Sequence, residues 1–117
     1  MPKLSSKCLN NVKQYTDLRF NHFGDEYVER RIKQVVRRLK KEPKQVQDEY
    51  TAKVDEFLEI NADVINQAKQ SHIEQGEEGI EKMLEMHREH AIELVMKHGG
   101  NVNAALAELN GDNHKQH

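Results

Sequence analysis

Apolar residues recur every three or four positions along most of this chain, which is the spacing of one face of an α-helix. The pattern predicts helices over residues 8–23, 25–41 and 44–75, followed by shorter helices between residues 80 and 109. We therefore expect an all-α fold of about five helices. Pro43 disfavours the helical conformation at the residue before it, and so separates the second helix from the third.

A glycine turn between two helices gives the clearest local pattern. Ala91, Leu94 and Val95 lie on the apolar face of the helix before the turn. Gly99–Gly100 ends that helix, because glycine tolerates the left-handed conformation of a helix C-cap. Asn101 can then cap a short following helix by accepting its free backbone N–H groups.

The stretch LVMKHGGNVNAALAEL contains, in order, a pair of apolar residues, a polar turn, Asn-Val, Ala-apolar and a final Leu. In this order it resembles a ubiquitin-associated (UBA-like) three-helix domain, a type that also occurs at the N-terminus of elongation factor Ts. Glu85 replaces the glycine of the family's Met-Gly-Phe loop, which such domains use to bind ubiquitin. The resemblance implies a C-terminal three-helix bundle that binds another protein.

The resemblance also implies a contact surface made by a loop at residues 84–90 and by the last helix. The residues expected on this surface are Leu84, Met86, Arg88 and Leu109. Our leading functional prediction is therefore a small, non-catalytic protein-binding adaptor or regulator. The alternative for Leu84, Met86 and Leu109 is that each is a core residue.

The glycine turn is also similar to the first half of a Fis-type helix-turn-helix, in which a recognition helix follows and enters the major groove. Only NGDNHKQH follows residue 109, and this segment is too short and too polar to be that helix. A helical hairpin without any family relation is the remaining alternative.

Charge is strongly segregated along the chain, although the formal net charge is only −2. Residues 1–44 carry 12 Lys and Arg against 5 Asp and Glu, whereas residues 45–117 carry 6 against 15. Seven of the 12 cations of residues 1–44 fall in the helix predicted over residues 25–41. Its cations are Arg30, Arg31, Lys33, Arg37, Arg38, Lys40 and Lys41.

This basic helix supports a second functional prediction, from a different class. Closely spaced Lys and Arg side chains can neutralise phosphates and release their counterions, so the chain could be a nucleic-acid-associated regulator. A third interpretation is that the basic helix is neutralised internally. Its partners would then be Glu49, Asp55, Glu56 and Glu59 of the 44–75 helix, or a second subunit.

The amino-acid composition bears on the size of the hydrophobic core and on the cellular compartment. Apolar residues make up 36% of the chain and aromatic residues only 5%, so a monomer core would be thin, and extended helices or a homodimer would compensate. The single cysteine excludes an internal disulfide, which fits a reducing compartment. No apolar run has the length of a signal peptide or a membrane span. These features predict a cytoplasmic protein without a membrane partner.

The domain organisation follows from the glycines and the charge. We expect a basic helical arm or hairpin over residues 1–75, with a long central helix over 44–75. Gly76–Gly79 is the predicted hinge, residues 76–111 form the UBA-like bundle, and residues 112–117 form a disordered tail.

No pattern of catalytic residues or metal ligands is present. Cys8 has no histidine placed beside it by the sequence, and Gly99–Gly100 lacks the Lys and Ser/Thr of a phosphate-binding loop. His87 and His90 can share a helix face, but a metal site needs three or four ligands. We therefore predict that the chain is not an enzyme and holds no metal and no cofactor.

Overall fold

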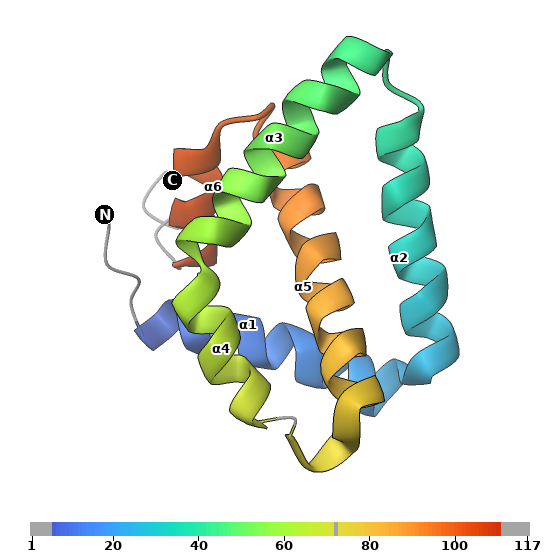
Figure 1. Ribbon diagram of the computed structural model, residues 1–117, viewed down its shortest axis with the longest axis vertical. Coiled ribbons are helices and arrows are strands. Elements are labelled where there is room, and N and C mark those ends of the chain that lie inside the picture. The colour runs from blue at the N-terminus through green and yellow to red at the C-terminus, as the bar shows by residue number, and fades with distance from the viewer. Residues whose placement is uncertain (1–5, 72, 111–117) are drawn as a thin grey trace.

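A computed structural model describes residues 6–71 and 73–110, and within these residues it contains helices and turns but no strand. The predicted all-α fold is confirmed. The helices are α1 (Ser6–Leu18), the π-helix η1 (Arg19–Phe23), α2 (Gly24–Lys40), α3 (Lys44–Ile60), α4 (Ala62–Ser71), the 3₁₀ turn η2 (Ile73–Gln75), α5 (Gly76–Lys97) and α6 (Val102–Leu109) (Figure 1). The tail predicted over residues 112–117 lies outside the described residues.

Helix α5 is the centre of the arrangement. Helices α2 and α3 meet near the turn at Pro43 and diverge from there, and α5 lies between them (Figure 1). Helix α1 crosses near the far end of α2, and α6 packs against α3 and α5. Direct contact between α2 and α3, which a helical hairpin would extend along both helices, is therefore limited to the region of their turn, and α5 contacts both instead.

One hydrophobic core joins all six α-helices. Its buried members include Val12 of α1, Val35 of α2, Phe57 of α3, Ala68 of α4 and Met83 of α5. The buried residues of α6 belong to the same cluster: Val102, Ala105, Leu106 and Leu109. Residues on both sides of the predicted boundary at Gly76–Gly79 thus belong to one shared core. Because all six helices contribute to it, the core forms with few aromatic residues.

The long helix predicted over residues 44–75 is interrupted. Helix α3 ends at Ile60, Asn61 adopts φ −88° and ψ 6°, and α4 begins at Ala62. The Asn61 N–H still donates to the Phe57 carbonyl at 3.1 Å, and the Asn61 carbonyl accepts from the Ile65 N–H at 2.9 Å, so this residue keeps backbone hydrogen bonds to both helices. Asparagine is a poor helix former, which explains why the break falls at this residue.

The C-terminal glycine turn forms as predicted. Gly99 and Gly100 have φ angles of 64° and 91°, and the Gly100 N–H donates to the Val95 carbonyl at 2.8 Å, as in a Schellman cap. The Asn101 side chain accepts a hydrogen bond from the Ala104 N–H at 3.0 Å. The helix–turn–helix pattern at this end is therefore confirmed.

The loop expected at residues 84–90 does not form. These residues lie within α5, which runs without a break from Gly76 to Lys97. No proline or glycine occurs between residues 80 and 97, and Glu, Leu and Met favour helix. A three-helix bundle with a loop at 84–90 is thus corrected to one long helix followed by α6.

Asn101→Ala is expected to lower the free energy of unfolding by about 1 kcal/mol, because it removes the only side-chain cap described for α6. Urea denaturation measures the change. Asn103→Ala, on the exposed surface of the same helix, is the matched control and should change stability by less than about 0.5 kcal/mol. Equal losses in the two variants would contradict the capping role.

Candidate functional site

The four residues predicted to contact a protein partner do not form one surface. Met86 and Leu109 lie in the core, with 0% and 3% of their surface exposed, so neither can touch a partner in the folded chain. Leu84 is 37% exposed. Arg88 is exposed and lies 3.5 Å from the Asp55 carboxylate. The core alternative is therefore correct for Met86 and Leu109, because the face of α5 and α6 that carries them turns inward.

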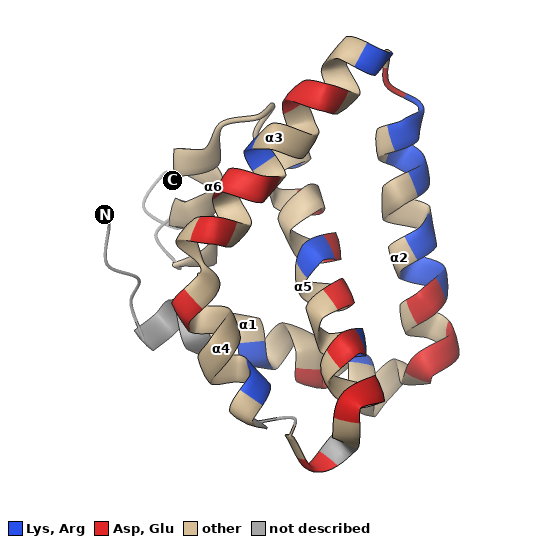
Figure 2. Cartoon of the chain, viewed as in Figure 1, with Lys and Arg blue, Asp and Glu red and all other residues tan. Residues whose placement is uncertain are grey.

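The basic helix predicted over residues 25–41 corresponds to α2, whose inner face is apolar. Val28 and Val35 are buried, whereas six of its seven predicted cations are exposed. Those six are Arg30, Lys33, Arg37, Arg38, Lys40 and Lys41. None of them forms an ion pair with a residue that the structure describes. Figure 2 shows this charge along α2, at the outer edge of the molecule.

Arg31 is the exception among the predicted cations. Its side chain is 28% exposed, its guanidinium forms an ion pair with Glu93, and its Nε lies 3.4 Å from the Glu89 carboxylate. Among the described residues, Arg31 is thus the one predicted cation of the basic helix that forms an ion pair with another helix. The partners come from α5 rather than α3, since Asp55 of α3 pairs with Arg88 instead.

A buried charge cluster lies where α1, α2 and α5 meet, around the carboxylate of Glu89, which is 1% exposed. The Tyr15 hydroxyl donates a hydrogen bond to Glu89, and the Arg19 guanidinium lies 3.6 Å from the same carboxylate. Burial raises the pKa of Glu89, while Tyr15, Arg19 and Arg31 favour its charged form. Burial and the hydrogen bond to the Glu89 carboxylate raise the pKa of the Tyr15 hydroxyl, so the phenol stays protonated.

Two histidines next to this cluster are neutral at physiological pH. His87 is 2% exposed, and neither of its ring nitrogens has a hydrogen-bond partner among the described residues. His90 stacks on Tyr15 with 4.0 Å between the ring centroids. Burial lowers the pKa of each histidine to about 4. Within the described residues no three His, Cys, Asp or Glu side chains are grouped to hold a metal.

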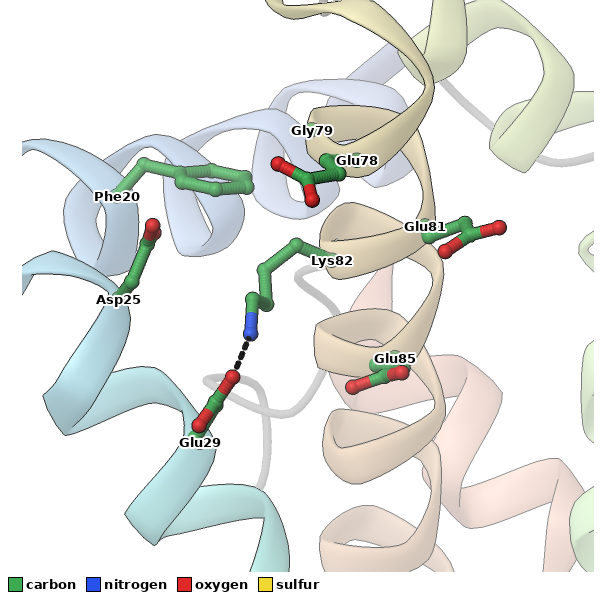
Figure 3. A pocket seen from close by; sticks show the side chains of 8 residues that line it. All are labelled: Phe20, Asp25, Glu29, Glu78, Gly79, Glu81, Lys82 and Glu85. Carbon is green, nitrogen blue, oxygen red and sulfur yellow. Dashed lines mark hydrogen bonds and ion pairs between the residues drawn. The ribbon is translucent and has the colours of Figure 1, made fainter.

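An acidic cleft of about 510 Å³ lies at the opposite end of α2 from most of its cations. It is lined by Phe20, Asp25, Glu29, Glu78, Gly79, Glu81, Lys82 and Glu85 (Figure 3). Lys82 reaches from α5 across the cleft, and its Nζ lies 2.6 Å from the Glu29 carboxylate. This hydrogen bond lowers the pKa of Glu29 and raises that of Lys82. Helix α2 is therefore polarised, with acidic residues at its start and cations along the rest.

Comparisons with known proteins give no match. No family model matches the chain, and neither a curated protein nor a solved structure does. Among the described residues, no helix combines the length and the apolar character needed to cross a bilayer. A function for this chain must therefore be argued from its own residues.

Proposed function

We propose that this chain binds nucleic acid through the cationic face of α2, which contacts the phosphate backbone. The cationic face is defined by Arg30, Lys33, Arg37, Arg38, Lys40 and Lys41. The observation that carries the proposal is that all six side chains are exposed and that none forms an ion pair within the described residues, although the chain as a whole is acidic. A stripe of exposed cations along one helix is the electrostatic footprint of phosphate binding.

The spacing of these cations suits a repeating anion. Arg30, Lys33 and Arg37 follow one another at three or four residues, so they lie on one side of the helix. Two shallow hollows adjoin this side, one bordered by Lys33 and Lys40 and the other by Arg38 and Lys41, and Arg37 borders both. From Arg30 to Lys41 the face extends roughly 16 Å, which is long enough for several consecutive phosphates.

The cationic face is held in place before any ligand binds. Val28 and Val35 anchor α2 in the structure, and Arg31 ties it to Glu89 and Glu93 of α5. The acidic cleft at the start of α2 repels phosphate, so it would keep the phosphates of the ligand on the cationic part of the helix. A non-catalytic binding role is part of this proposal.

A protein-binding adaptor is the second candidate. The observation in its favour is that Leu84 and Arg88, two of the residues named by the UBA-like resemblance, are exposed one turn apart on α5. It is less well supported, because Met86 and Leu109 are buried and Arg88 already lies near Asp55. The UBA-like relationship itself stays a prediction.

Arg37→Gln combined with Arg38→Gln is expected to weaken binding to a labelled 20-nucleotide DNA at least tenfold at low salt. Six phosphate contacts predict a slope of log K against log salt of roughly −4 for a single strand and −5 for a duplex. Removing two contacts should make either slope shallower by about 1.5. Fluorescence anisotropy over a series of salt concentrations measures both quantities.

Lys53→Gln combined with Lys69→Gln is the matched control, because it removes the same charge from α3 and α4. Its slope should equal that of the unmodified chain, and its affinity should fall by much less. If both double variants lose affinity equally, the attraction comes from net charge and not from α2. If the unmodified chain binds no DNA at low salt, the proposed function is wrong.

A further inference from the structure

Two exposed aromatic rings lie at the start of α2, before its cationic residues. Phe23 ends the π-helix η1, and Tyr27 lies four residues later, in the first turn of α2. Their ring centroids are 4.3 Å apart with an interplanar angle of 26°, so the rings stack on each other. They are 47% and 36% exposed, in a chain with only six aromatic residues of the Phe and Tyr types and no tryptophan. Two stacked rings at the surface offer a flat apolar platform.

The buried charge cluster holds this aromatic pair in position. The Arg19 guanidinium lies 5.7 Å from the centre of the Tyr27 ring and 4.6 Å from that of Tyr15. It also donates to the Tyr15 hydroxyl at 2.6 Å and lies near Glu89. Tyr27 therefore has Phe23 and Arg19 as neighbours, and Phe23, the more exposed ring, is the one with surface left to stack on.

Tyr27 and the cations form one strip along α2, and Phe23 precedes the strip across the helix break at Gly24. Tyr27, Arg30 and Gln34 follow at helical spacing, and Arg37, Arg38 and Lys41 continue the series. From Tyr27 to Lys41 the strip is about 21 Å long, at 1.5 Å per residue. At a spacing of roughly 3.4 Å per nucleotide, about six stacked nucleotides match that length, and a base on Phe23 would precede them. Asp25 and Glu29 line the acidic cleft beside this strip.

We infer that the ligand is single-stranded nucleic acid, with one base stacked on Phe23 and the following phosphates on the cationic face. This inference rests on the proposed function and names its substrate class. A single strand offers both a free base face and a backbone, and proteins that bind it combine stacking aromatics with a cationic track. A duplex hides its base faces in its own stack, so it would use the cations alone.

The test uses the full chain with Phe23→Trp, which introduces a tryptophan where the chain has none. Titration with an eight-nucleotide oligothymidylate is expected to quench the tryptophan fluorescence, with saturation at the concentration where anisotropy shows binding. A 20-base-pair duplex is expected to bind without that quenching. Binding of the oligothymidylate without any quenching would overturn the inference.

Phe23→Leu provides the second measurement, since it keeps an apolar side chain but removes the ring. Its affinity for the oligothymidylate should fall roughly 5- to 100-fold, while its affinity for the duplex and its salt slope stay unchanged. Leu18→Ala, at a neighbouring exposed residue outside the strip, is the control. It should leave the affinities for the oligothymidylate and for the duplex unchanged. Phe23→Leu binding the oligothymidylate as tightly as the unmodified chain overturns the inference but leaves the proposed function standing. Failure of the unmodified chain to bind either nucleic acid overturns both.

Discussion

Glu89→Ala is expected to lower the free energy of unfolding by about 3–5 kcal/mol. The Glu89 carboxylate is almost fully buried and is the shared partner of Tyr15, Arg19 and Arg31. Without it, the guanidinium of Arg19 remains in the interior with no carboxylate beside it, and desolvating an unpaired charge is much more costly than losing an exposed ion pair. Urea denaturation at pH 7 measures the change.

Glu85→Ala is the control for this prediction, because Glu85 lies one turn earlier on α5 and is exposed. Its effect on stability should stay within about 0.5 kcal/mol. If the two alanine variants are equally stable, the cluster around Glu89 contributes nothing beyond a surface pair, and α1, α2 and α5 are held together by apolar packing alone.

Acidification is expected to destabilise the fold through His87. The folded chain holds this histidine neutral until its pKa of about 4, whereas in the unfolded chain it takes a proton near pH 6.5. Between these two values the unfolded state binds more protons, so stability falls as pH falls and is fully present only above pH 6.5. The difference of about 2.5 pKa units corresponds to a loss of about 3 kcal/mol between pH 7 and pH 4.

His87→Leu isolates this contribution from the other titrating groups. His90 adds to the loss of stability at low pH, because burial also lowers its pKa. The raised pKa of Glu89 acts in the opposite direction. The leucine variant should be more stable than the unmodified chain at pH 4.5 and should show a flatter stability profile from pH 7 to pH 4.5. It should be at least as stable at pH 7, since no ring nitrogen of His87 has a partner to lose. Parallel pH profiles for the two chains would show that His87 is not buried as a neutral ring.

Local signals in the sequence were sufficient for most of the helices. The apolar stripe of α2, with Val28 and Val35, and the turn at Gly99–Gly100 depend on residues a few positions apart, and both are confirmed. The continuity of α5 was missed because the UBA-like resemblance implied a loop at residues 84–90, and the hinge predicted at Gly76–Gly79 reached into the helix. Only Gly76 adopts a positive φ, and Gly79 lies within the helix.

In the candidate site, too, local patterns could be predicted from the sequence and long-range pairings could not. Exposure of six cations on α2 could be predicted, because an amphipathic helix turns its charged side outward. The pairing of Arg31 with Glu89 and Glu93 could not, since it joins residues about 60 positions apart. The i, i+4 spacing of Tyr15 with Arg19 and of Glu89 with Glu93 was the available signal. This spacing indicates one polar pair on each of two helices, but it does not indicate that the two pairs face each other.

The order of the helices along the chain affects how the protein is made. The facing sides of α2 and α3 diverge, so Val35 and Val54 need α5 to cover them. At a synthesis rate of roughly 5–20 residues per second, the end of α5 leaves the ribosome about 2–7 s after the end of α3. During that interval the nascent chain carries uncovered apolar stripes, and chaperones have time to bind them before the native core can close.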